Sequence, residues 1–180
     1  ELRKRQDELL TKNQKTGLKY FEDIEKRIPR AEINEYSDIL ANVFSKLKHK
    51  GSKFEIVGSY RRGTATSGDI DIILTNAQDD KSIFDKFIKA LQDRGIIIEI
   101  LTKGKTKSMV MGQLPGQTPR RLDFMYASPA EYSFAILYFT GSKALNVVMR
   151  QRALDLGYSM NEHGFHKMEG KKKGAKLDME

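Results

Sequence analysis

The chain has 180 residues, of which 39% are hydrophobic and 31% are charged, and its formal net charge is +8. This length predicts one domain with a small attached lobe, and the absence of cysteine excludes disulfides, thiolate zinc sites and cysteine nucleophiles. No run of about 18 apolar residues and no apolar signal-peptide core occurs, so we expect neither a membrane partner nor secretion. The excess of Lys and Arg favours a polyanionic partner, with nucleic acid first, although an unrelated basic protein would carry the same charge.

The first predicted elements are helices. Thr11, with Gln14 three residues later, forms a capping-box pattern that begins a helix, and Pro29 ends or restarts it. Apolar residues at helical spacing then predict a second helix, with a buried stripe, from residue 31 to about residue 50. Gly51 is a suitable residue to end this helix.

The middle of the chain predicts a sheet. The expected strands are residues 53–59, 69–75, 96–101, 107–114 and 120–126. An amphipathic helix over residues 81–95 follows the second strand, and a tight connection joins the last two strands. Because strands and helices do not alternate regularly, we predict an α+β fold with a mixed sheet and covering helices.

The last third of the chain predicts a small helical lobe with a terminal hairpin. Helices are expected over residues 129–141 and 142–157, with Gly141 between them, and the hairpin over residues 158–170. Residues 170–180 are charged and have no core pattern. We therefore expect this tail to be mobile.

The stretch GSYRRGTATSGDIDIIL, residues 58–74, ends in two aspartates that are one residue apart. On a strand, Asp69 and Asp71 point the same way, about 7 Å apart, while Ile70 and Ile72 line the other face. Such carboxylates repel each other unless a cation lies between them, and Mg²⁺ binds one or two carboxylates together with substrate phosphates. An isolated D-x-D pattern is more often a turn cap beside a solvated strand residue.

The residues before this pair favour the metal. Gly58 and Ser59 are expected to end a strand and to begin a helical turn, whose backbone amides favour anions. Arg62 can form a fork onto phosphate oxygens, and Gly68 lets the backbone approach a ligand closely. A phosphate-binding corner next to a metal-binding strand is the layout that holds a magnesium-bound triphosphate.

A third acid is expected, because two ions that clamp a phosphoryl transfer need carboxylates from two directions. Asp123 lies in the predicted strand RRLDFMY, between Leu122 and Phe124. Considered alone, it is equally consistent with a position facing solvent. Beside Asp69 and Asp71 it is the best candidate for the third ligand.

Six segments together resemble the family X DNA polymerases of the beta and lambda type, in order and at similar spacing: GLKYFEDIEKRIPR, GSYRRG, SGDIDIILT, LTKGKTKSMV, RRLDF and LYFTGS. The resemblance covers residues 1–169 and implies a nucleotidyltransferase-type sheet. It implies a remnant of the helix that links fingers to palm (1–30), a catalytic palm (31–128) and a nucleotide-selection or thumb subdomain, truncated at its C-terminus (129–180). The family's N-terminal lyase and helix-hairpin-helix regions are expected to be absent.

The resemblance also implies the roles of individual residues. Two Mg²⁺ ions, for which Mn²⁺ can substitute, would be held by the catalytic Asp69, Asp71 and Asp123. Contacts to the incoming nucleotide are implied for Gly58, Ser59, Arg62, Gly68, Asp69, Asp71, Tyr138, Phe139, Thr140, Gly141 and Asn146. Contacts to DNA are implied for Lys103, Lys105, Lys107, Arg121 and Arg150.

Some of these residues have simpler interpretations. Tyr138 resembles a steric gate against ribose, but aromatic residues at a helix end are usually core, and Phe139 fits that role. Without the surrounding motifs, we would interpret Arg121 and Arg150 as surface arginines. Lys143 stands where the beta type has an acidic residue, so base stacking at that position is in doubt.

The resemblance implies a template-directed, gap-filling repair polymerase that adds deoxynucleotides from dNTPs to a primer 3′-hydroxyl by a two-metal mechanism. We expect it to bind gapped or primed DNA as a monomer, in the nucleus if the source is eukaryotic. The connection Pro115–Arg120 is too short to replace a template strand, as a long insertion does in template-independent members. The alternatives are another nucleotidyltransferase, RNA-tailing or terminal-transferase-like, or a DNA- and dNTP-binding fragment whose activity is weak because regions are missing.

Overall fold

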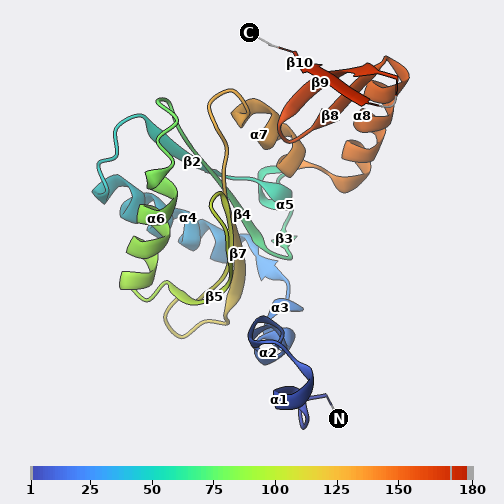
Figure 1. Cartoon of the computed structure of the whole chain (residues 1–180). Helices are drawn as coiled ribbons and strands as arrows, with labels where there is room; N and C mark the ends of the chain where they lie inside the picture. The colour runs from blue at the N-terminus through green and yellow to red at the C-terminus, as the bar shows by residue number, and fades with distance from the viewer. Residues whose placement is uncertain (1, 171, 178–180) are drawn as a thin grey trace.

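A computed structural model of the chain describes residues 2–170 and 172–177. It consists of a five-stranded sheet with helices, a smaller lobe that follows it in the chain, and short helices that extend from the other end of the sheet (Figure 1). Within the described residues, no helix has the length and apolar character needed to cross a membrane.

The N-terminal segment forms short helices. The capping box at Thr11 is confirmed, because its backbone N–H donates to Gln14 Oε1 at 2.9 Å and Gln14 N–H donates to Thr11 Oγ1 at 3.4 Å. The expectation of one helix up to Pro29 is wrong, because the helical backbone is interrupted at Tyr20. The break lets the Tyr20 ring pack against Leu101 of the sheet. The elements are α1 (Gln6–Leu9), α2 (Lys12–Lys19) and α3 (Phe21–Ile24).

The predicted mixed sheet is confirmed, in the order β2-β4-β7-β6-β5. Only the pair β4 and β7 is parallel, and the other neighbours are antiparallel. The strands are β2 (Ser52–Ile56), β4 (Ile70–Asn76), β5 (Ile97–Lys103), β6 (Lys107–Gly112) and β7 (Arg120–Tyr126).

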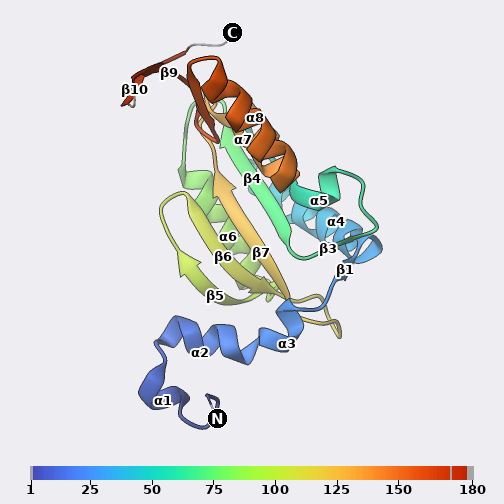
Figure 2. The ribbon, with the colours of Figure 1, turned by 90° about the vertical axis from the view of Figure 1, so that its right-hand side faces the viewer.

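Two helices cover one face of this sheet, α4 (Arg30–Lys46) and α6 (Ser82–Asp93) (Figure 2). Their apolar stripes pack on alternate residues of the strands, such as Ile70, Ile72 and Phe124, which are fully buried. Phe87 of α6 makes an edge-to-face contact with Phe124 at a ring-centroid distance of 5.9 Å. The core therefore lies between the sheet and these helices, and it takes every second strand residue.

The opposite face of the sheet is covered only at its two ends. Tyr20 and Ile24 pack on Leu101 and Met111 at one end. At the other end, Ala135 and its helix pack on Ile73, Met125 and their neighbours. The stretch between these two apolar clusters is left to polar side chains.

The smaller lobe follows, with α7 (Tyr132–Thr140), α8 (Lys143–Asp155), β8 (Tyr158–Asn161), β9 (Gly164–Glu169) and β10 (Lys172–Lys176). The predicted hairpin is present, but β10 adds a third strand in the order β10-β9-β8. Residues 172–176 of the tail that was expected to be mobile thus form a strand, because backbone pairing with β9 needs no apolar pattern. For residues 171 and 178–180 that expectation lies outside the described residues.

A buried ion pair joins the sheet to the N-terminal segment. Arg120 Nε and Nη2 donate to the two carboxylate oxygens of Glu32, each at 2.7 Å, and both side chains are at most 10% exposed. Arg120 Nη1 also donates to the carbonyl oxygen of Lys26 at 3.2 Å. One guanidinium thus connects the first residue of β7, the first turn of α4 and the chain that enters α4.

We expect Glu32→Met to lower the free energy of unfolding by about 3–5 kcal/mol, because it leaves the Arg120 guanidinium buried without its counter-charge. The double variant Glu32→Met with Arg120→Met should recover much of this loss. Asp93→Asn, which breaks the exposed pair with Lys89, is the control and should cost less than about 0.5 kcal/mol. Urea denaturation measures the free energy of unfolding of all three variants. A Glu32→Met variant as stable as the control would contradict a stabilising role of this buried ion pair.

Candidate active site

The three predicted acids meet on the open face of the sheet. The parallel register of β4 and β7 places Asp71 directly opposite Asp123, and Asp69 immediately precedes β4. One carboxylate oxygen from each of the three residues lies within 4.8 Å of the others. Among the described residues this is the only group of acids and histidines close enough to share a metal ion.

The charges of these acids repel one another. Burial, followed by the charges of Asp69 and Asp123, raises the pKa of Asp71 to about 7. Burial raises the pKa of Asp123 to about 6, while the Arg121 guanidinium opposes this shift and the Asp69 charge adds to it. Part of the negative charge is therefore unfavourable at neutral pH in the protein alone.

Arg121 lies among these acids. Its Nη2 donates to Asp69 Oδ2, and its Nε lies 3.3 Å from Asp123 Oδ1. The guanidinium thus supplies positive charge where the carboxylates converge. Three carboxylates that accept a cation in this way form a suitable oxygen donor set for a divalent ion such as Mg²⁺.

A single helical turn, α5 (Gly58–Arg61), lies against these acids. Gly58 has φ +63°, and a side chain at this position would overlap the Asp71 carboxylate, so only glycine fits. Ser59 Oγ donates to Ser67 Oγ at 2.7 Å, which ties the turn to the chain that leads to Asp69. The predicted turn after the first strand is therefore present and lies directly beside the acids.

Arg27 joins this corner from a distant part of the sequence. The short strand β1 (Ile28–Pro29) pairs with β3 (Thr66–Ser67), and Arg27 Nη2 donates to the carbonyl oxygen of Thr66 at 2.8 Å. Sequence analysis missed Arg27, because a pairing of two residues across this separation leaves no local pattern.

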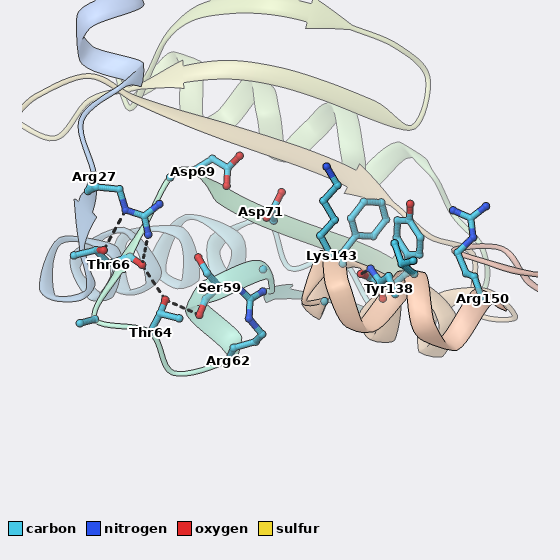
Figure 3. A pocket seen from close by; sticks show the side chains of 17 residues that line it. Arg27, Ser59, Arg62, Thr64, Thr66, Asp69, Asp71, Tyr138, Lys143 and Arg150 are labelled. Atoms are coloured by element: carbon cyan, nitrogen blue, oxygen red, sulfur yellow. Dashed lines mark hydrogen bonds between the residues drawn. The ribbon is translucent and has the colours of Figure 1, made fainter. Parts of the chain in front are cut away.

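An open pocket of about 890 Å³ lies beside the acids, between α5 and the smaller lobe (Figure 3). Four cationic side chains line it, from Arg27, Arg62, Lys143 and Arg150, together with Asp69 and Asp71. The other predicted residues that line it are Gly58, Ser59, Gly68, Tyr138, Phe139, Gly141 and Asn146. A concave, cationic surface next to converging carboxylates is suited to a polyphosphate that is bound with metal.

The end of α7 forms the far wall of this pocket. The rings of Tyr138 and Phe139 meet edge to face at 5.1 Å, and Phe139 also packs on the apolar cluster beneath α7. Asn146 Nδ2 donates to the carbonyl oxygen of Tyr138 at 2.7 Å. Thr140 does not line the pocket, and its carbonyl oxygen accepts from Arg62 Nη1 at 2.7 Å.

The three predicted DNA-binding lysines do not converge on the pocket. Lys103 Nζ lies 3.2 Å from Asp85 of α6, toward the helix-covered side of the sheet. Lys107 Nζ lies 3.7 Å from Glu162 of the smaller lobe, and Lys105 is exposed in the connection between β5 and β6. The separation of Lys103 from the other two follows from its position on the sheet, which the sequence did not indicate.

The raised pKa values predict how the metal-free protein responds to pH. The native state keeps a proton on Asp71 up to about pH 7, whereas an unfolded aspartate releases it near pH ~3.9. The native state therefore binds more protons in this range, and its stability falls as the pH rises from about 4 to about 7. Asp71→Asn should remove much of this slope.

Urea denaturation in EDTA, at pH 5 and pH 8, tests this expectation. Asp38→Asn, which changes an exposed aspartate of α4, is the control and should keep the slope of the unchanged protein. Added Mg²⁺ should raise stability at pH 8 in the unchanged protein but much less in Asp71→Asn. Equal slopes in all three proteins would contradict a raised pKa of Asp71.

Comparison with known proteins agrees with this geometry. The family described as DNA polymerase beta palm matches residues 27–129, and that described as DNA polymerase beta thumb matches residues 135–180. DNA polymerase lambda of Arabidopsis thaliana is 37% identical over 171 residues, which cover 88% of this chain and 32% of that protein. DNA polymerase lambda of Rattus norvegicus is 33% identical over 163 residues, which cover 86% of this chain and 28% of that protein.

A more distant similarity is to the DNA nucleotidylexotransferase of Xenopus laevis, 25% identical over 205 residues, which cover 92% of this chain and 40% of that protein. The chain spans about a third of the length of the two lambda polymerases. With palm and thumb regions matched in order over most of its length, the chain belongs to the DNA polymerase beta family, the family X DNA polymerases.

Proposed function

We propose that this chain is the catalytic region of a template-directed DNA polymerase that fills short gaps during repair. It adds deoxynucleotides from dNTPs to a primer 3′-hydroxyl on gapped or primed DNA, and it acts as a monomer. The observation that carries this proposal is the convergence of Asp69, Asp71 and Asp123 beside a pocket lined by cationic side chains. A triphosphate in the pocket would lie next to the carboxylates that hold its metal ions.

The incoming triphosphate is held by the corner around α5. Arg27 and Arg62 reach the pocket from two sides, and Ser59 lies between them. Arg62 uses one of its five N–H donors on Thr140, so its other donors are free to bind phosphate oxygens. Gly58 keeps a side chain out of the space beside Asp71, and Gly68 lines the pocket next to Arg27.

Asp69, Asp71 and Asp123 would hold two Mg²⁺ ions, for which Mn²⁺ can substitute. When bound, these ions supply charge neutralisation, a lower pKa for the attacking hydroxyl and stabilisation of the leaving pyrophosphate. Asp123 would accept the proton of the primer 3′-hydroxyl. Arg121 competes with a divalent cation for the oxygens of Asp69 and Asp123.

The far wall of the pocket selects the nucleotide. Tyr138 faces the sugar and excludes a ribose 2′-hydroxyl, while Phe139 supports its ring from the apolar cluster below. Asn146, Thr140 and Gly141 set the position of this wall. Arg150 on α8 contacts the template strand. Lys103, Lys105 and Lys107, which do not line the pocket, contact the DNA backbone as salt-sensitive phosphate contacts.

Untemplated transfer is the alternative. Only residues 113–119 separate β6 from β7, and Gln117 is held by a hydrogen bond from its Nε2 to Glu35 at 2.9 Å. This short and anchored connection leaves the template's place open, which supports templated synthesis.

We expect Asp123→Asn to lower kcat/KM for single-nucleotide insertion by more than about 100-fold, because loss of a direct metal ligand should exceed the 10- to 100-fold loss typical of its supporting residues. Asp93→Asn, a matched change on an exposed face of α6, should keep normal activity. Circular dichroism confirms that both variants fold. Normal insertion by a folded Asp123→Asn would remove this residue from the site.

Nucleotide insertion should also depend on the template strand. Insertion into a duplex with a one-nucleotide gap should follow the templating base when the four dNTPs are offered separately. A bare single strand at the same concentration should be extended at a far lower rate. Comparable extension of both DNAs would move the chain toward untemplated transfer.

A further inference from the structure

Arg61 is the first arginine of the segment SYRRG, and it does not line the pocket. Its Nε donates to Glu55 Oε1 at 2.7 Å, and its Nη1 donates to Thr140 Oγ1 at 3.2 Å. One guanidinium therefore joins β2, the turn α5 and the last residue of α7. Its neighbour Arg62 donates to the carbonyl oxygen of Thr140, so two adjacent arginines hold one residue by its side chain and its backbone.

Glu55 is itself held in place by α7. The hydroxyl of Tyr132, the first residue of α7, donates to Glu55 Oε2 at 3.1 Å. Burial and the Glu55 charge raise the pKa of Tyr132 well above its ordinary value, so this hydroxyl stays a donor. The ammonium group of Lys53 lies over the Tyr132 ring, 4.1 Å from its centre.

Both carboxylate oxygens of Glu55 thus accept a hydrogen bond, Oε1 from Arg61 and Oε2 from Tyr132. Tyr132 begins α7 and Thr140 ends it, and Glu55 and Arg61 connect these two residues along β2 and α5. The wall of the pocket, residues 138–141, consists of the last three residues of α7, which Arg61 holds at Thr140, and of Gly141. A shift of this end relative to α5 would change the distance between the phosphate-binding corner and that wall.

We propose that Arg61 and Glu55 are positioning residues that fix the wall at residues 138–141 relative to the phosphate-binding turn, and so set the discrimination between deoxyribose and ribose. The inference rests on the proposed function, in which the triphosphate binds at α5 and the sugar faces Tyr138. Neither residue touches the nucleotide in this account.

This role is separable from a contribution to stability. The side chains of Arg61 and Glu55 are 43% and 40% exposed, and exposed ion pairs add little to the free energy of unfolding. Selectivity, in contrast, depends on small displacements of groups that position the substrate. Loss of the pair should therefore change substrate selection more than it changes the melting temperature.

The experiment measures kcat/KM for dTTP and for UTP, opposite adenine in a one-nucleotide gap. The variants are Arg61→Gln, Glu55→Gln and both together, and the control is Arg5→Gln, which breaks an exposed arginine–glutamate pair far from the pocket. Arg61→Gln should lower the ratio of dTTP to UTP by roughly two- to fivefold, the range for loss of such a pair. Since Glu55 acts through Arg61, the double variant should match Arg61→Gln, and Arg5→Gln should keep the original ratio.

The outcomes separate this inference from the proposed function. An unchanged ratio in Arg61→Gln, with a lower melting temperature, would show a merely structural pair and overturn the inference alone. A double variant whose effect is the sum of the two single changes would also overturn it. Failure of the unchanged protein to insert dTTP, or to prefer it over UTP, would overturn the proposed function and the inference with it.

Discussion

The register between β4 and β7 is the constraint on which the candidate site depends. These strands are the one parallel pair in the sheet, and their alignment sets Asp71 beside Asp123 on the open face. A slip of one residue would turn Asp123 toward α4 and α6, where Phe124 now packs. The buried residues on the covered face therefore fix the positions of the acids on the other face, and the core tolerates the repulsion between them.

The pocket beside the acids is assembled by contacts between residues that are far apart in the sequence. Arg27 is brought in by the pairing of β1 with β3, and the buried pair of Glu32 and Arg120 holds the chain that leads to it. On the other side, Arg61 and Arg62 hold the end of α7. Three separate parts of the chain thus form the site, and hydrogen bonds from charged side chains hold each part in place.

Local patterns predicted the elements of the sheet and the chemistry of the segment around Asp69 and Asp71, because alternation and glycine turns act over a few residues. The sequence did not predict what depends on distant partners. Tyr20 interrupts a helix because it packs on the sheet, and β10 forms because β9 offers a free edge. The positions of Arg27 and Arg61 likewise depend on contacts with distant residues, and the neighbouring sequence does not indicate these contacts.

Locating a bound metal ion would show whether Asp69, Asp71 and Asp123 form the metal site. Crystals of the protein grown with Mn²⁺ and dTTP, measured for the anomalous scattering of manganese, would show where the ion binds. We expect a peak coordinated by oxygens of Asp69, Asp71 and Asp123, with Arg121 displaced from them. A peak away from these residues, or none while Arg121 still pairs with Asp69, would contradict the assignment of these acids as the metal site.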